Sequence, residues 1–214
     1  MTLQWTERGF GQRWGGRQLA RTAAVQTALL AAWLGGGTAV ASPITLFGTG
    51  VDDLGLSLAP GEVDPHYTLM ASDDPVFPGP ETFAVEAALP AGWIAAGGNA
   101  QWIAPQADRL DGGSPLGSYL YRTTFDLTDT DPATASISGL WAADNIGLIF
   151  LNGIYTGFTN LAGPSVLTPF EITDGFQEGE NLLDFVIVNS GTSANPTGLL
   201  VDIAGSVTNI PEPS

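Results

Sequence analysis

Side chains that could bind a sugar lie at a few positions in the 214-residue chain. Asp144, Asn145 and Asn152 carry oxygens that accept hydrogen bonds from sugar hydroxyl groups. Trp93 and Trp102 lie in glycine- and proline-rich stretches, where an indole could serve as a stacking platform for a sugar ring. Asp and Asn also make tight turns, because their side chains bond the nearby backbone. Both interpretations, ligand binding and turn formation, stay open for these residues. For the two tryptophans the alternatives are packing in the core and stacking on a sugar ring.

Arg122 is a further candidate for ligand binding. It lies in an alternating segment, on the polar face opposite Tyr119 and Tyr121. A guanidinium group can hold a sugar or a carboxylate through two parallel hydrogen bonds. The alternative is a structural salt bridge to a neighbouring carboxylate, such as Asp126 or Asp184.

Paired aspartates offer a second kind of site, a structural calcium site. Asp108 and Asp111 lie in a glycine-containing loop, and Asp129 and Asp131 lie in a predicted turn. Calcium takes six to eight oxygen ligands from carboxylates and carbonyls. Neither pair belongs to a complete calcium-loop motif. The pattern therefore allows a structural Ca²⁺ at these residues but does not require one.

Catalytic patterns are sparse. The chain has one histidine, His66, and no cysteine, which excludes thiol catalysis. No nucleophile elbow, zinc-binding helix motif or phosphate loop is present. A carboxylate pair could hydrolyse a glycosidic bond, but we expect a protein that is not an enzyme, with no catalytic residue.

The elements that would position these residues read as β-strands. Turn-forming residues recur every several positions after residue 42, and apolar residues alternate or cluster in short runs, which is typical of an all-β sandwich or barrel. Segments 147–151 and 182–188 are apolar on both faces, Asp184 apart, and should be central strands covered on both sides. The Asn152-Gly153 pair predicts a hairpin. The predicted strands are 44–48, 66–71, 83–87, 118–127, 135–142, 147–151, 165–172, 181–189 and 198–207.

The N-terminal segment 1–41 has the pattern of a secretory signal peptide. Four arginines precede an apolar run over about residues 23–34, and small residues up to Ala41 predict cleavage there. Four of the six basic and one of the 22 acidic residues lie in this segment. The remaining chain would hold 21 acidic residues against two arginines, a formal charge of −19. Such a surface repels nucleic acid and anionic membranes, and we expect no stable membrane span in the mature chain.

Several ordered motifs together resemble the galactose-binding-like jelly roll of carbohydrate-binding modules. They run from Trp102-Ile103-Ala104-Pro105 through the segments 119–127, 141–145, 149–153 and 179–185 to Asn195-Pro196-Thr197-Gly198-Leu199. The resemblance covers about residues 63–205. It implies two antiparallel sheets packed face to face, ligands at the loops of one end or on a concave face, and often a structural Ca²⁺.

The C-terminal Pro211-Glu212-Pro213 resembles the start of the PEP-CTERM sorting signal of exported proteins in Gram-negative bacteria that make exopolysaccharide. In that family a transmembrane stretch and a basic cluster follow, so we expect the sequence to be truncated just inside the signal. The expected organisation is a signal peptide (1–41), one β-sandwich domain (42–207) and a proline-rich tail (208–214).

These features predict an exported, non-catalytic carbohydrate-binding-like module of the extracellular matrix or cell surface, with glycans or exopolysaccharide as partners. The alternative is a structural or adhesive matrix protein without a defined sugar pocket. A glycoside hydrolase is the least favoured function.

Overall fold

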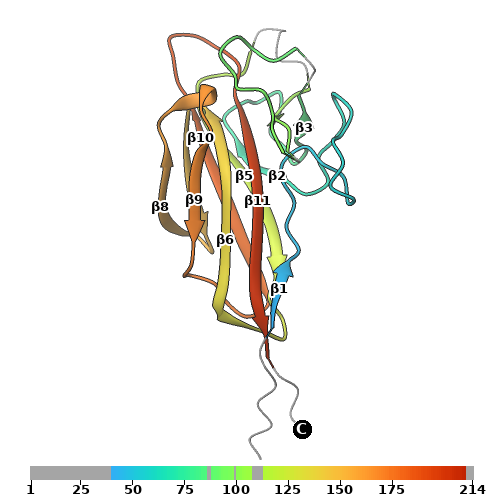
Figure 1. The fold of residues 1–214 in the computed structure, drawn as a ribbon. Coiled ribbons are helices and arrows are strands. Elements are labelled where there is room, and N and C mark those ends of the chain that lie inside the picture. Colours follow the sequence, from blue (N-terminus) through green and yellow to red (C-terminus); the bar gives the residue numbers. More distant parts are fainter. Residues whose placement is uncertain (1–39, 86–87, 99, 108–112, 211–214) are drawn as a thin grey trace, which may run out of the picture. The chain divides into compact units, whose positions relative to one another are not determined.

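The protein forms two antiparallel β-sheets packed as a sandwich (Figure 1). The computed structural model describes residues 40–85, 88–98, 100–107 and 113–210. All of them belong to one compact unit. The predicted all-β, two-sheet antiparallel fold is confirmed. No helix in the described ranges has the length and apolar character needed to cross a membrane.

The first sheet has six strands and is built around the two longest strands of the fold. β11 pairs with β6 along most of its length, and the register shifts between Ser206 and Thr208. β1 pairs with β11 as well, beside the main path of the sheet. The strands are β3 (Phe83–Ala84), β4 (Ile103–Ala104), β11 (Gly198–Asn209), β6 (Thr130–Asp144) and β9 (Thr168–Ile172), in spatial order, with β1 (Ala41–Ile44).

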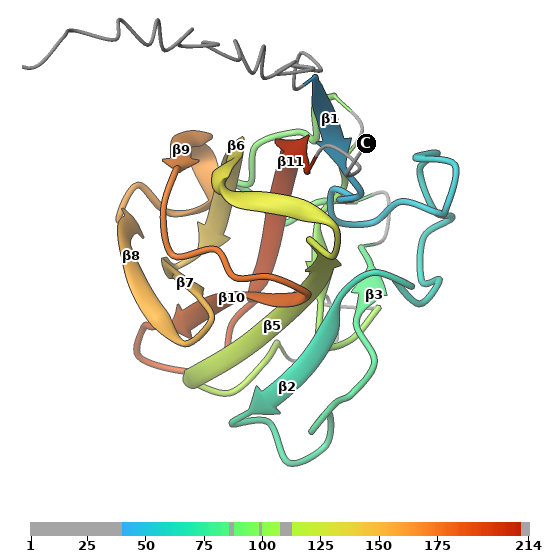
Figure 2. The ribbon, with the colours of Figure 1, turned by 90° about the horizontal axis from the view of Figure 1, so that it is seen from below.

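The second sheet has five strands, with β10 at its centre. In spatial order they are β2 (Thr68–Ser72), β5 (Gly117–Asp126), β10 (Glu180–Asn189), β7 (Ile146–Leu151) and β8 (Ile154–Asn160). The prediction that segments 147–151 and 182–188 are inner strands is confirmed. Figure 2 shows this sheet and the six-stranded sheet as two layers.

Some predicted strands differ from the observed ones. β4 and β8 were not predicted, because β4 has only two residues and β8 is an edge strand in which every residue before Asn160 is exposed or half-buried. The strand predicted at 44–48 is replaced by β1, which ends at Ile44. The strand predicted at 165–172 begins only at Thr168, because a short 3₁₀ helix, Gly163–Ser165, precedes it.

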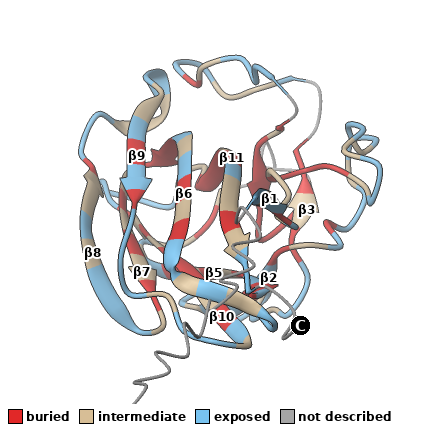
Figure 3. Cartoon of the chain, turned by 60° about the horizontal axis from the view of Figure 1, so that its bottom comes forward, coloured by how far each residue is buried: buried red, intermediate tan, exposed pale blue. Residues whose placement is uncertain are grey.

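The main core lies between the two sheets (Figure 3). Alternation along the strands sends every second side chain inward. The largest fully buried side chains include Tyr119 and Tyr121 of β5, Trp141 of β6 and Phe185 of β10. Trp141 and Phe185 belong to different sheets, and their ring centroids lie 5.9 Å apart. The core therefore joins the inner faces of both sheets through aromatic contacts.

A second, smaller core covers part of the other face of the six-stranded sheet. Ala142 and Leu200 alternate with residues of the main core, and so point away from it. Trp93 and Trp102, from the long connection between β3 and β5, pack with them. This connection therefore acts as a third layer over one end of the sheet.

The outer face of the five-stranded sheet differs from the sequence prediction. We expected segments 147–151 and 182–188 to be covered on both sides. The inward side chains of β7 and β10 are buried, but their outward ones, such as Leu148, Phe150 and Val186, are only half-buried. One face of these strands is thus covered by the second sheet, and the other remains partly open to solvent.

Candidate functional site

Asp144 and Asn145 form the corner between β6 and β7. The Asp144 side chain is 5 % exposed, and its Oδ2 accepts a 2.7 Å hydrogen bond from Trp93 Nε1. The Asp144 carbonyl accepts a 2.7 Å bond from the Thr197 hydroxyl. Asn145 Oδ1 accepts a 2.7 Å bond from the Ser190 N–H. Both side chains thus form hydrogen bonds to other segments of the chain, Asp144 to Trp93 and Asn145 to Ser190, which favours the turn-forming interpretation.

Trp93 and Trp102 do not have the exposure that a stacking platform needs. They are 8 % and 1 % exposed, and their ring centroids lie 4.0 Å apart. Trp102 Nε1 donates a 2.9 Å bond to the Ile94 carbonyl. Sugar stacking requires an exposed ring face, so the structure argues against this role and assigns both indoles to the second core.

Asn152 makes the predicted hairpin between β7 and β8. Its φ of 52° lies in the left-handed region, which Asn tolerates better than most residues. Its amide nitrogen donates 2.9 Å bonds to the Gly175 carbonyl and to Asn181 Oδ1, and its Oδ1 accepts a 2.9 Å bond from the Leu182 N–H. These bonds use both polar atoms of the side chain, so Asn152 acts as a corner residue in this structure.

Arg122 forms the salt bridge expected with one of its two candidate carboxylates, Asp184. Arg122 Nε and Nη2 donate bonds of 2.6 and 2.8 Å to the two Asp184 oxygens. The side chains are 25 % and 8 % exposed, so the arginine borders solvent and the aspartate does not. Hydrogen bonding to Asp184 raises the pKa of Arg122 above its usual value. The bidentate geometry already satisfies both carboxylate oxygens, which leaves Arg122 as a partner within the fold.

The aspartate pairs do not assemble into a metal centre in the described part of the chain. Asp108 and Asp111 lie outside the described residues. Asp131 Oδ1 accepts a 3.1 Å bond from the Ala133 N–H, as in an ordinary Asp turn, and Asp129 has a φ of 59°. Among the described residues, no three His, Cys, Asp or Glu side chains are grouped so that they could hold a metal ion.

A buried carboxylate that the sequence analysis did not single out holds the N-terminal loops. Asp64 accepts bonds of 2.6, 2.7 and 3.1 Å from the backbone N–H groups of Gly50, His66 and Tyr67. Burial raises the pKa of Asp64, although the three N–H donors oppose that shift. The imidazole of His66 stacks on Phe47 with ring centroids 3.7 Å apart. These contacts give His66 a packing role.

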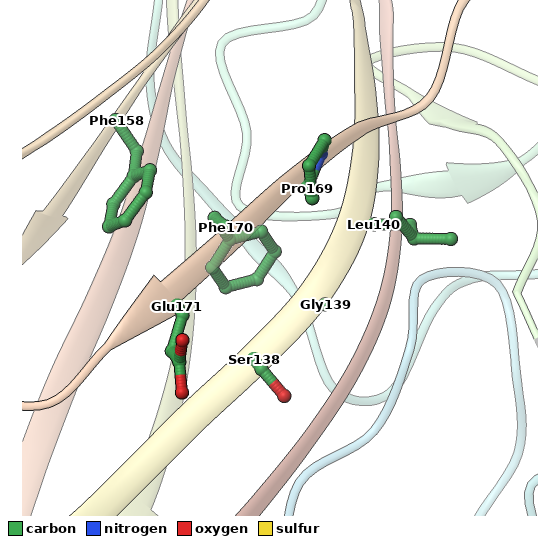
Figure 4. A pocket seen from close by; sticks show the side chains of 7 residues that line it. All are labelled: Ser138, Gly139, Leu140, Phe158, Pro169, Phe170 and Glu171. Atoms are coloured by element: carbon green, nitrogen blue, oxygen red, sulfur yellow. The ribbon is translucent and has the colours of Figure 1, made fainter.

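An open depression of about 700 Å³ lies over β6 and the edge strand β9 and reaches β8 (Figure 4). Register places Ser138 opposite Glu171 and Leu140 opposite Pro169, and these four side chains are exposed. The other lining residues are Gly139, Phe158 and Phe170.

The aromatic part of the depression depends on a glycine. Phe158 of β8 is half-buried, and its ring centroid lies 6.3 Å from that of Phe170. A Cβ atom at Gly139 would lie 2.8 Å from the Phe170 ring and 2.3 Å from the Asp202 carbonyl oxygen. Only glycine therefore lets this ring lie across β6. The sequence analysis missed the depression, although a glycine inside a strand often marks such a close approach.

The depression combines groups that suit a polyhydroxylated ligand. Leu140, Pro169 and Phe158 present apolar surface, and the Ser138 hydroxyl and Glu171 carboxylate supply hydrogen-bonding atoms beside it. Its volume falls in the range of about 300–1,000 Å³ that is usual for small-molecule sites. No protein-family model and no curated protein matches this chain.

Proposed function

We propose that this protein is an exported, non-catalytic glycan-binding module and that the depression over β6 and β9 is its sugar site. The observation that carries this proposal is the pairing of an apolar patch with a carboxylate and a hydroxyl in one open hollow. The N-terminal signal-like segment and the absence of cysteine are compatible with export, since nothing in the chain depends on a disulfide.

The chemistry of the lining supports a sugar ring as ligand. The C–H face of a pyranose can rest on Phe158, Leu140 and Pro169, while its hydroxyl groups donate to Glu171 and exchange bonds with Ser138. The hollow is open, so a polysaccharide could continue past it in both directions.

Charge narrows the class of glycan. The chain carries 22 acidic residues against six basic ones, and Glu171 adds a carboxylate inside the hollow itself. Such a field disfavours polysaccharides rich in uronic acid or sulfate. Neutral or amino-sugar glycans are therefore the ligands that we expect to bind.

A glycan array followed by calorimetric titration of the best ligand tests the proposal. We expect saturable binding that Phe158→Ala weakens about tenfold, because an aromatic contact is worth about 1.4 kcal/mol. Glu171→Gln should weaken it as well, because it removes the charge from the acceptor. Phe77→Ala and Glu178→Gln are matched controls, since Phe77 is also half-buried and Glu178 is also exposed. Thermal melting establishes that each variant is folded.

The possible outcomes separate the candidate functions. Silence on an array that includes neutral and amino-sugar glycans refutes glycan binding and favours the structural matrix protein. Binding that neither site variant weakens refutes the site. Release of reducing sugar from exopolysaccharide would instead identify a hydrolase.

A further inference from the structure

Glu171 is the charged side chain of the hollow over β6 and β9, and it is exposed on the edge strand β9. Two ion pairs are found among the described residues, and their carboxylates are those of Asp53 and Asp184. Within that part of the chain, Glu171 thus has no counter-ion. A carboxylate in this position can form a charge-assisted hydrogen bond with a cationic group of a ligand.

Basic side chains are scarce in the described ranges. The chain has no lysine, and Arg122 is the one arginine that these ranges include. Arg122 lies in β5 of the other sheet, where its Nε and Nη2 donate to the two oxygens of Asp184. His66, the single histidine, stacks on Phe47. Both basic groups are therefore engaged with other residues, and neither pairs with Glu171.

The hollow has a polar end and an apolar end. Glu171 lies opposite Ser138 in the register, and Figure 4 shows the oxygens of both side chains pointing in the same direction. Leu140 and Pro169 form the next outward pair on the same two strands and supply apolar surface. Two residues of a strand advance by about 7 Å. A sugar ring that rests on the apolar pair can therefore bring one of its substituents to the carboxylate.

The substituent that this carboxylate binds most tightly is a free amino group. Hydroxyl, acetamido and ammonium groups all donate hydrogen bonds to a carboxylate, but only the ammonium group adds the attraction of opposite charges. The chain has a formal charge of −16, which strengthens that attraction over the whole surface. The lysine side chain of a peptide would also supply an ammonium group, but it lacks a ring that could cover Leu140 and Pro169.

We propose that the hollow prefers sugars with a free amino group, so that its ligand is a glycan of amino sugars that are not N-acetylated. This inference rests on the proposed function, because it requires the hollow to bind sugar. The ring lies on Leu140 and Pro169, its ammonium group donates to Glu171, and the Ser138 hydroxyl accepts a further bond. N-acetylation removes the charge and therefore weakens binding.

Calorimetric titration of the full chain with three disaccharides tests this preference. The β-linked disaccharides of glucosamine, N-acetylglucosamine and glucose differ in the substituent at one carbon of each ring. The titration is made at about pH 5.5, where an amine is protonated and a glutamate is ionised. At about 0.15 M salt, charges farther away than about 8 Å are screened, so that the preference reports the hollow and not the acidic surface as a whole.

We expect the glucosamine disaccharide to bind about three- to fivefold more tightly than the other two. This ratio corresponds to about 0.7–1 kcal/mol, which is within the range of exposed ion pairs. Glu171→Gln should lower the ratio of the glucosamine to the glucose affinity to about one, whereas Glu171→Asp keeps the charge and should keep a preference. Glu178→Gln is the matched control at another exposed carboxylate and should leave the ratio at its wild-type value. A ratio is used because it cancels any general loss of sugar binding.

The outcomes separate this inference from the proposed function. Glucose or N-acetylglucosamine disaccharides that bind as tightly as the glucosamine disaccharide would overturn the preference and leave the sugar site in place. A preference that survives Glu171→Gln, or that Glu178→Gln lowers equally, would come from the acidic surface in general and would also overturn it. If no disaccharide binds, the inference and the proposed sugar site both fail. Binding of an oligolysine that depends on Glu171 would in that case identify a basic peptide as the ligand.

Discussion

Removing one partner of the Arg122–Asp184 pair should cost stability to a degree that depends on which partner remains. The Asp184 side chain is 8 % exposed and the Arg122 side chain 25 %. Arg122→Met leaves a carboxylate that water reaches poorly. Asp184→Leu leaves a guanidinium that can turn toward solvent. We therefore expect the arginine variant to be the less stable of the two.

The magnitudes follow from the burial of the group left behind. Breaking a buried ion pair costs about 3–5 kcal/mol, and a hydrogen bond to a charged group contributes about 1.5–3 kcal/mol. We expect Arg122→Met to lower the free energy of unfolding by about 3–4 kcal/mol and Asp184→Leu by about 2 kcal/mol. The double variant should lie within about 1 kcal/mol of the wild type, because Phe150 and Val186 flank Asp184 with apolar surface and the new side chains match it.

Urea unfolding at neutral pH and one low protein concentration measures these values. For a domain of this size, 1 kcal/mol corresponds to about 2–4 °C in Tm. Urea is preferred because guanidinium chloride screens the pair. Glu178→Gln, at an exposed carboxylate, serves as the control and should leave Tm unchanged. Equal losses in the two single variants, or a double variant as unstable as Arg122→Met, would refute the reasoning.

Three further predictions concern the corners and the buried polar groups. Asn152→Ala should lower the free energy of unfolding by about 2–3 kcal/mol, because it loses three hydrogen bonds and Ala disfavours a φ of 52°. Asn152→Gly should lower it by less, because glycine tolerates this φ. Equal losses of stability in the two variants would contradict the argument from the backbone. Trp93→Phe keeps an aromatic ring in the second core but removes the hydrogen bond to Asp144. It should lower the free energy of unfolding, measured in urea, by about 1.5–3 kcal/mol. An unchanged free energy of unfolding would show that this hydrogen bond does not stabilise the fold. Burial raises the pKa of Asp64 above 3.8, so the stability that the protonated form contributes is present below that pH and is lost as pH rises through the folded-state pKa. The difference in unfolding free energy, wild type minus Asp64→Asn, should therefore fall as the pH is raised above 3.8. A difference that rises instead would contradict the direction of the pKa shift.

Local pattern was sufficient to predict the faces of the inner strands. Tyr119 and Tyr121 were predicted on one face of their strand and Arg122 on the other, and the structure buries both tyrosines and leaves the arginine at the boundary with solvent. Alternation carries this information because the strand repeat is two residues. The edge strand β8 was not predicted, because an edge strand buries few side chains and so shows no strong alternation of apolar and polar residues.

The candidate site was less accessible from sequence. Asn152 was correctly expected to make a hairpin, and Asp184 was one of two carboxylates named for Arg122. The depression was missed because its lining comes from three strands, and its aromatic floor depends on the approach of Phe170 to Gly139, a contact across 31 positions of chain. No local window contains that information.

The sequence by itself determined the sandwich, the acidic charge, the inward faces of the strands and the Asn152-Gly153 hairpin. The tertiary structure alone decided which outer faces are covered. Trp93 reaches Asp144 across 51 positions and helps to cover one sheet, while Leu148 and Val186 stay half-exposed on the other. The physical reason is that the strand repeat assigns a side chain to a face locally, whereas the layer that covers this face comes from a distant segment whose position only the packed chain determines.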